Sequence, residues 1–364
     1  TTAYREIVEG RVSIKHEAWD IVNDMLGGKL TKHIERVKNG ELTSKDLANA
    51  LKTAINSVYG LTSANFDNPF RDIRNKDNIV AKRGALFMVD LKHEVQKRGF
   101  TVAHIKTDSI KIPDATPEII KFVIDFGKRY GYTFEHEATY DRMCLVNNAV
   151  YIAKYKDPDE CVAMYGYAPG DNKKHKNKPW TATGKQFAVP YVFKTCFSRE
   201  PVTINDMRET FSVKSALYLD MNEKLPQLTI EEEKELAKLH KAWDSEDSEN
   251  MEKVLKSYRY DAEYAGERYS ELRKKEEESH NYVFIGKVGQ FCPIKQGCNG
   301  GLLMREKDGK YYAAGGSKGY RWLEAEMVKE LGKEADIDRS YYENMVNDAI
   351  CDISQYGDFE WFVN

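Results

Sequence analysis

The sequence lacks the patterns that mark several large classes of protein. Its six cysteines include no C-x-x-C pair and its eight histidines no H-x-x-x-H spacing, so neither a zinc knuckle nor a disulfide framework is indicated. It has no run of about 18 apolar residues, so we expect no membrane-spanning segment. We also expect no signal peptide at its start. Reduced thiols without a targeting segment predict a cytoplasmic protein.

Net charge is low as well, although charged residues are plentiful. The 364 residues carry a net charge of −3, so any site for a polyanion must be local. Charged residues make up 31% of the chain and hydrophobic residues 41%, which is typical of a globular protein with two or three domains. The first residue is threonine rather than methionine, so we expect the chain to be part of a longer protein.

Helix and strand signals alternate over the first 155 residues. Three helices are predicted from start and stop signals: from Thr43, with Asp46 in a capping box, to Gly60; over 78–98 before Gly99; and from Thr116 to the residue before Gly131. Residues 100–113 have the β-branched content of two short strands with a turn at 107–109. Further strands are predicted at 132–138 and 145–155. This order is typical of an α+β fold with an antiparallel sheet and packed helices.

The composition changes after Tyr155, which makes that region a plausible domain boundary. The composition of residues 166–180 predicts a polar, basic loop, and residues 229–280 are predicted to be a highly charged helical stretch that begins T-I-E-E. Residues 281–322 are rich in glycine and aromatics, and we expect strands and turns there. None of the glycine clusters has the spacing of a phosphate-binding loop.

Two short motifs carry the functional information. In K-T-A-I-N-S-V-Y-G, at residues 52–60, Lys52, Asn56 and Tyr59 fall on one helix face at about 100° per residue, with Gly60 just beyond. A cation, an amide, a phenol and a bare backbone on one face indicate contact with a ligand. In I-K-T-D-S-I, at residues 105–110, an aspartate lies at the tip of the predicted hairpin. There a carboxylate can approach a divalent metal for phosphoryl transfer.

In this order the two motifs resemble those of family B DNA polymerases and look most like a bacteriophage branch of that family. In the family, a K-x-x-x-N-S-x-Y-G helix in the fingers precedes a D-T-D-S hairpin in the palm. The resemblance covers roughly residues 8–155. It implies a helical fingers hairpin at 1–62, part of the palm at 63–156, and a mostly helical thumb at 157–364 with a small strand- and turn-rich C-terminal region.

The resemblance also implies roles for single residues. The chain would carry part of a DNA-directed DNA polymerase that uses primer–template DNA, dNTPs and two Mg²⁺ ions, with Mn²⁺ as an alternative. Asp108 would be a catalytic metal ligand and Glu137 a supporting one. Lys52 would bind the triphosphate and protonate the leaving pyrophosphate. The other residues of the dNTP site would be Arg11, Lys15, Asn56, Tyr59 and Gly60.

The sequence departs from the family pattern in several places. Lys106 replaces the first aspartate of D-T-D, and the K-K-x-Y strand that grips duplex DNA becomes N-A-V-Y, which keeps only Tyr151. Further DNA contacts would then come from a basic loop that contains Lys173, Lys174, Lys176 and Lys178. Motif A, which supplies the second catalytic aspartate, is not found before Arg11. We therefore expect the chain to need a missing N-terminal polymerase segment.

Other interpretations stay open from the residues alone. Arg11 and Lys15 could simply pair with neighbouring acids, namely Glu6, Glu9 or Glu17. The hairpin aspartate could be an ordinary turn former, and the lysine-rich loop could be only solvated. The alternative functions are a non-catalytic DNA-binding remnant, a split subunit of a phage replication polymerase, or a different palm polymerase such as a reverse transcriptase. The last fits poorly, because N-S-V-Y-G is not its fingers chemistry.

Overall fold

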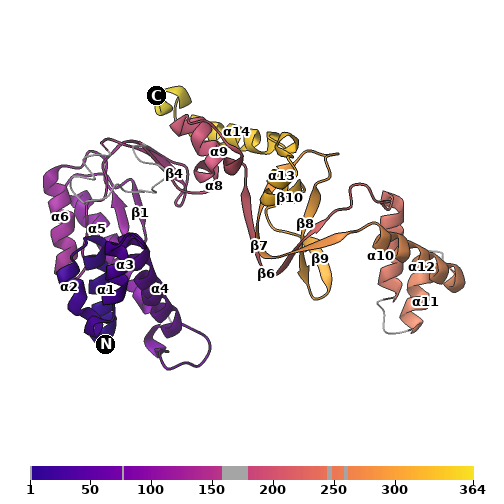
Figure 1. Cartoon of the computed structure of the whole chain (residues 1–364), viewed down its shortest axis with the longest axis horizontal. Coiled ribbons are helices and arrows are strands. Elements are labelled where there is room, and N and C mark those ends of the chain that lie inside the picture. Colours follow the sequence, from indigo (N-terminus) through magenta and orange to yellow (C-terminus); the bar gives the residue numbers. More distant parts are fainter. Residues whose placement is uncertain (1, 76–77, 158–178, 244–247, 258–260) are drawn as a thin grey trace. The chain divides into compact units, whose positions relative to one another are not determined.

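The computed structural model describes residues 2–75, 78–157, 179–243, 248–257 and 261–364 (Figure 1). The chain separates into two compact units, one of Thr1–Ala149 with Lys154–Thr181 and the other of Val150–Ala153 with Ala182–Asn364. The described residues form many helices together with antiparallel sheets. The predicted α+β class is therefore confirmed at this level.

The first unit begins with helices that share one apolar core. They are α1 (Thr2–Lys15), α2 (Trp19–Asp24), α3 (Thr31–Lys38) and α4 (Ser44–Thr62). Ile14 of α1 is fully buried and belongs to the same cluster as Leu47 and Ala48 of α4, which α2 and α3 complete. Apolar residues spaced three and four apart thus make α1 pack on α4.

Helix α4 confirms one sequence signal and contradicts another. Thr43 Oγ1 accepts a hydrogen bond from Asp46 N, and Asp46 Oδ2 accepts one from Thr43 N, both at 3.1 Å, so the capping box is present. The expected stop at Gly60 is wrong, because the helix continues to Thr62 and is capped at Ser63. A glycine ends a helix where the backbone turns left-handed, and Gly60 has no positive φ.

A helix, a hairpin and a second helix follow in the predicted order. They are α5 (Ile79–Lys97), β1 (His104–Lys106), β2 (Ser109–Lys111) and α6 (Pro117–Arg129). Gly99 follows α5 with φ +84°, and Thr116 caps α6, as expected. The strands pair antiparallel, and Ile105 and Ile110 pack on the buried core that α5 and α6 share.

Of the strands expected at 132–138 and 145–155, the first is wrong and the second is present over part of its range, as β4. Strand β3 spans Tyr140–Leu145, β4 spans Tyr151–Tyr155 and β5 spans Trp180–Ala182, in the order β3-β4-β5. Residues 132–139 form no strand, because side-chain packing holds them instead. Phe134 lies against Gly127 of α6, where an added Cβ would be 2.5 Å from the ring.

The second unit is built around an antiparallel sheet that closes on itself. Its strands are β6 (Glu209–Asp220), β7 (Tyr282–Ile294), β8 (Gly301–Lys307), β9 (Lys310–Ala313) and β10 (Arg321–Glu324). The order is β10-β7-β6-β8-β9, and β10 also pairs with β8 through Trp322 opposite Gly301. Strands β6, β7, β8 and β10 therefore form a closed ring without a free edge between them.

The strand content predicted for 281–322 is confirmed, whereas β6 was missed, although it is the central strand. In its sequence, E-T-F-S-V-K-S-A-L-Y-L-D, the apolar residues Phe211, Val213, Leu217 and Leu219 occupy alternate positions, which is the period-two pattern of a strand. The pattern is interrupted at Ser215, where the register against β7 also shifts between Ser212 and Leu217. The signal for this strand was therefore present in the sequence.

Aromatic side chains fill the ring. Phe211, Phe291 and Trp322 come from three strands, and the Phe211 ring centroid lies 5.0 Å from that of Trp322 and 5.9 Å from that of Phe291, edge to face. Gly289 faces this cluster, since an added Cβ would lie 2.6 Å from the Phe291 ring. The aromatic ring of Phe291 lies so close to the backbone that it requires glycine at position 289; the backbone makes no turn there.

We expect Gly289→Ala to destabilise the second unit by about 1–3 kcal/mol, because a new methyl group would overpack a fully buried ring. The measurement is the free energy of unfolding in urea. Gly315→Ala is the matched control, since an added Cβ there meets nothing within 4 Å. It should change stability by less than about 0.5 kcal/mol. Equal losses in both variants would contradict the packing argument.

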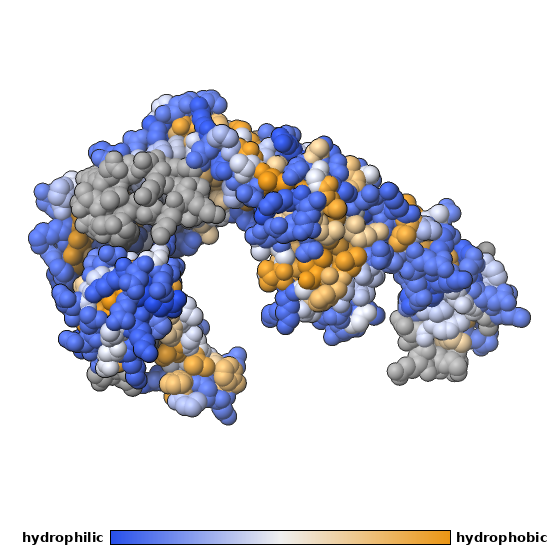
Figure 2. Space-filling view, in the orientation of Figure 1, coloured by the Kyte–Doolittle hydropathy of each residue, from blue (hydrophilic) through white to orange (hydrophobic). Residues whose placement is uncertain are grey.

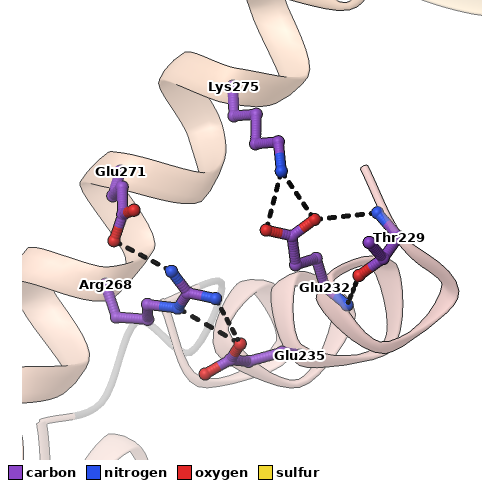
Figure 3. A network of polar contacts seen from close by, with 6 residues as sticks. All are labelled: Thr229, Glu232, Glu235, Arg268, Glu271 and Lys275. Carbon is purple, nitrogen blue, oxygen red and sulfur yellow. Dashed lines mark hydrogen bonds and ion pairs between the residues drawn. The ribbon is translucent and has the colours of Figure 1, made fainter. Parts of the chain in front are cut away.

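A helical bundle lies between β6 and β7 in the sequence, as the charged stretch 229–280 predicts. It consists of α10 (Ile230–Trp243), α11 (Ser248–Ser257) and α12 (Ala262–Glu278) around leucines and alanines. Lys275 of α12 donates to both carboxylate oxygens of Glu232 on α10 at 2.8 Å. Hydrogen bonds from Lys275 and the Thr229 backbone hold the pKa of Glu232 at about 2. Figure 3 shows this polar network, formed by Thr229, Glu232, Glu235, Arg268, Glu271 and Lys275.

The described part of the second unit contains further helices outside the bundle. The α-helices are α8 (Lys185–Ala188), α9 (Pro190–Phe193), α13 (Ala325–Glu330), α14 (Ser340–Ser354) and α15 (Phe359–Val363). Tyr342 of α14 is fully buried and stacks on Tyr191 of α9 with ring centroids 5.0 Å apart. Short 3-10 or π segments in the two units span Met25–Gly28, Ile73–Asn75, Lys194–Ser198, Ile204–Asp206 and Glu334–Asp336.

An acid is buried at the start of β6. Glu209 is 7% exposed, and burial raises the pKa of its carboxyl, against the opposing charges of Lys185 and Lys318. Burial also raises the pKa of Tyr341 and Tyr342 on α14, and the carboxyl of Glu209 raises it further. The closed ring and α14 thus enclose a group that is less stable in its ionised form.

We expect the stability of the second unit to fall as this acid ionises. The folded-state pKa of Glu209 is raised above its ordinary value of 4.5, so the folded protein keeps this proton to higher pH than the unfolded chain does. Its contribution to stability is therefore lost as the pH rises above 4.5. Glu209→Gln cannot ionise, so its free energy of unfolding should increase relative to the wild type from pH 4.5 to neutrality. The exposed Glu330→Gln is the control, and a difference that does not change with pH would contradict the prediction.

Candidate functional site

The outer face of α4 displays the residues that the sequence places together. Lys52, Asn56 and Tyr59 are exposed, Tyr59 by 39%, and Gly60 is exposed beside them. The apolar positions of α4 pack in the helical core, which determines the face that remains outside. Lys52 and Asn56 make no side-chain hydrogen bond or ion pair with any residue that the structure describes. The face is therefore available to a ligand.

Arg11 lies on the side of α1 that packs toward α4. It is three positions from the fully buried Ile14, and residues three apart share a helix face. Arg11 is half-buried, and its Nε is buried without a hydrogen-bond partner among the described residues. A buried N–H without an acceptor costs about 1–3 kcal/mol, and a guanidinium stays charged. This position therefore favours an anion. Lys15, one turn further on, is exposed.

The acids nearest to Arg11 in the sequence have other partners. Glu9 pairs with Arg5 at 2.8 Å. Glu6 and Glu17 accept hydrogen bonds from residues beyond α1, at 3.2 and 2.8 Å. The simplest alternative for Arg11, a surface ion pair with one of these acids, therefore has no support among the described contacts.

Asp108 lies at the tip of the β1–β2 hairpin, as predicted. Lys106 pairs with Ser109, so Thr107 and Asp108 form the turn, and the exposed Asp108 donates its N–H to Lys106 O at 2.6 Å. Thr107 has φ +52° and is the one β-branched residue among the nine described non-glycine residues with positive φ. Such backbone strain is uncommon and concentrates at functional turns.

We expect Thr107→Gly to stabilise the first unit by about 0.5–1 kcal/mol. Glycine adopts the left-handed backbone without the Cβ clash, although its greater freedom in the unfolded chain offsets part of the gain. The free energy of unfolding measures the effect. Thr107→Ala is the matched control, because it removes the branch but keeps the Cβ, and should gain much less. A loss of stability in Thr107→Gly would show that the turn is not strained.

Glu137 lies in the extended segment before β3 rather than on a strand, which corrects its expected placement. It is exposed and close enough to Lys111 of β2 to affect that residue. Burial lowers the pKa of Lys111, the carboxylate of Glu137 opposes this decrease, and Lys106 adds to it. Glu137 is therefore near the hairpin that carries Asp108.

The described residues offer only part of a metal site. Asp108 and Glu137 provide carboxylate oxygens, the ligand type that Mg²⁺ prefers. Among the described residues, however, no group of three or more His, Cys, Asp or Glu side chains is placed to hold a metal ion. Two carboxylates could contribute to a site for Mg²⁺ if further oxygen ligands came from substrate or from another polypeptide.

The residues predicted to contact DNA are divided between described and undescribed parts of the chain. Tyr151 is half-buried at the start of β4 and belongs to the second unit. Residues 158–178 lie outside the described residues, and with them Lys173, Lys174, Lys176 and Lys178.

Sequence reasoning missed an apolar loop after α4. Phe66, Phe70 and Ile73 are 62%, 56% and 82% exposed, and Figure 2 shows hydrophobic residues gathered on this loop. The side chain of Asn68 supports it, donating to Leu61 O at 3.0 Å and accepting from the Phe70 backbone at 2.9 Å. An open depression of about 800 Å³ is lined by Asp67, Asn68, Arg71 and Ile73. The dense turn residues of N-F-D-N-P-F-R-D could have indicated an ordered loop.

The chain matches no protein-family model and no curated protein sequence. Within the described ranges, none of the helices combines the length and the apolar character needed to cross a bilayer.

Proposed function

We propose that this chain is the C-terminal part of a DNA-directed DNA polymerase of family B, of the bacteriophage type. Residues 1–62 would be the fingers, 63–156 part of the palm, and 157–364 the thumb and C-terminal region. The order of the K-x-x-x-N-S-x-Y-G and T-D-S motifs supports this assignment. The reaction would be template-directed transfer of nucleotides from dNTPs to a DNA 3′ end, in the cytoplasm of the cell.

The observation that carries the proposal is the combination of groups on two packed helices. Helix α1 contributes Arg11, whose buried Nε has no described partner, and α4 presents Lys52 and Asn56 on an exposed face. Tyr59 and Gly60 continue that face, and an added Cβ at Gly60 would meet nothing within 4 Å. A dNTP requires cations and an amide to bind its triphosphate. It also requires a flat surface, such as that of Tyr59 and Gly60, against its base.

The chemistry assigns each group a task. The primer 3′ hydroxyl would lose its proton to water and its oxygen would form a bond to the α-phosphorus, while the bond from that phosphorus to the pyrophosphate oxygen breaks. Arg11, Lys15 and Lys52 would bind the triphosphate, and Lys52 would give a proton to the departing pyrophosphate. Asn56 would support the triphosphate. Tyr59 and Gly60 would lie against the new base pair, where a larger side chain at 60 would interfere.

Asp108, supported by Glu137, would hold Mg²⁺, with Mn²⁺ as a substitute. When bound, the two ions neutralise the negative charge that develops on the phosphates. A missing N-terminal polymerase segment would supply the second aspartate. Tyr151 and the lysines of 173–178 would hold the primer–template duplex, mainly by contacts with phosphates.

A second candidate is a non-catalytic DNA-binding remnant or a split subunit. Among the residues that the structure describes, no group of three or more His, Cys, Asp or Glu side chains is placed to hold a metal ion, which is compatible with this option. It differs from the leading proposal in one measurable property. A remnant would bind duplex DNA but would not bind dNTP in a manner that depends on Mg²⁺.

We expect the chain to bind dNTP in the presence of Mg²⁺ and a primer–template with a dideoxy end, measured by calorimetry. Lys52→Ala should weaken dNTP binding about 10- to 100-fold, because it removes a charged contact to phosphate. Lys32→Ala, an exposed lysine on α3, is the matched control and should have no effect. Equal binding by the wild type and Lys52→Ala would contradict the proposed site.

A second measurement is primer extension, in which the wild-type chain alone is compared with the Asp108→Asn variant. We expect no extension from either protein without the N-terminal segment. Extension that disappears in Asp108→Asn would support the metal ligand, but would show that the chain already contains a second carboxylate.

A further inference from the structure

The last turn of α4 carries Tyr59 and Gly60, and the loop after the helix holds this turn in place. The last four carbonyl groups of an α-helix have no partner within the helix, so other groups must donate to them. In α4, which ends at Thr62, these are the carbonyls of residues 59–62. Their hydrogen-bond donors include the side chains of Thr62, Ser63 and Asn68 and the backbone N–H of Asp72. The loop thus determines how the end of α4 is placed.

A chain of two side-chain hydrogen bonds reaches the carbonyl of Tyr59. Asn75 Nδ2 donates to Thr62 Oγ1 at 2.7 Å. The same Thr62 hydroxyl donates to Tyr59 O, also at 2.7 Å. A hydroxyl that accepts one hydrogen bond is a better donor in the next, so the two bonds strengthen each other. The chain therefore links the 3-10 turn Ile73–Asn75 to the backbone that presents Tyr59 and Gly60.

Asn75 is buried at a cost to stability. Its side chain is 4% exposed, and its Oδ1 has no hydrogen-bond partner among the described residues. A buried acceptor without a donor is destabilising, and this opposes the gain from the bond that Nδ2 makes. A leucine of similar volume would leave no unpaired polar atom at this position. Overall stability therefore does not explain an asparagine here, whereas its bond to Thr62 does.

The triphosphate end of the proposed dNTP site does not depend on this chain of bonds. Lys52 lies about two helical turns before Tyr59, and Arg11 is on α1. The packing of α1 on α4, through the cluster that contains Ile14 and Leu47, places both cations. Loss of the bonds from Asn75 should therefore loosen only the end of the site that faces the base.

We propose that Asn75 is a positioning residue for the base-facing end of the dNTP site and acts through Thr62 on the backbone of Tyr59 and Gly60. The inference rests on the proposed function, because it adds to the dNTP site a support that lies outside the K-x-x-x-N-S-x-Y-G motif. Asn75 would not contact the nucleotide itself. Its effect should be on the binding of the base and not on the binding of the triphosphate.

The test is calorimetry of the full chain with Mg²⁺ and a primer–template with a dideoxy end, using two ligands: the complementary dNTP and inorganic tripolyphosphate. Asn75→Leu should bind the dNTP about fivefold more weakly, as expected for one lost hydrogen bond between neutral groups, and tripolyphosphate within about twofold of the wild type. Its melting temperature should stay the same or rise, because the unpaired Oδ1 is removed.

The matched control is Asn65→Leu, which changes an exposed asparagine of the same loop that makes no side-chain hydrogen bond with a described residue. It should leave both affinities within about twofold of the wild type. Two variants test the hydroxyl. Thr62→Val should repeat the loss of dNTP affinity, whereas Thr62→Ser should bind like the wild type. The double variant Asn75→Leu with Thr62→Val should lose no more than either single variant, since both remove one chain of bonds.

Unchanged dNTP affinity in Asn75→Leu, beside a wild type that binds the dNTP, would overturn this inference alone. So would an equal loss of affinity for dNTP and tripolyphosphate, which would indicate general damage to the fold. Equal losses in Thr62→Ser and Thr62→Val would also overturn it, because the hydroxyl would then have no part in the effect. A wild-type chain that binds neither ligand would reject the proposed dNTP site, and the positioning role with it.

Discussion

The candidate dNTP site depends on one contact, the packing of α1 on α4. Ile14 and Leu47 belong to a cluster that excludes water, and this cluster sets the rotation of both helices about their axes. Once that rotation is set, Arg11 must lie at the edge of the contact and Lys52 must point outward. The apolar core thus determines where the charged groups are, even though it contains none of them. A cavity-forming change at Ile14 would disturb the site without touching a ligand.

The hairpin shows a different relation between stability and site geometry. A tight turn with a β-branched residue in left-handed backbone is less stable than a glycine turn of the same shape. Asp108, the next residue, lies at the exposed tip of this turn. The packing of the hairpin isoleucines on the α5–α6 core offsets the local strain. The position of Asp108 therefore depends on the burial of Ile105 and Ile110 further along the two strands.

Local signals predicted helix starts and the hairpin turn well, although the helix end expected at Gly60 was wrong. The Thr43 capping box, the Thr116 cap and the hairpin at 107–109 are all present, because each depends on a few neighbouring residues. Long-range packing decided other features: Phe134 packs on Gly127 in the segment where a strand was expected. The alternating apolar residues of β6 are a local strand signal that was missed. The face of α4 was predictable from its period, whereas the buried Arg11 Nε without a described partner depends on tertiary contacts.

The bundle between β6 and β7 also has a consequence for the order of folding. Asp220 accepts hydrogen bonds from His280 and from the backbone of Asn281, across about 60 residues. Closing so long a loop in a flexible chain is entropically unfavourable, and the cost grows with loop length. The three helices make mostly local contacts and can form before the strands meet. Once folded, they leave only short connections on either side. The folded bundle thereby brings the end of β6 close to the start of β7. Pairing of these two strands, which begins at Asp220 and Tyr282, then requires the closure of only a short loop.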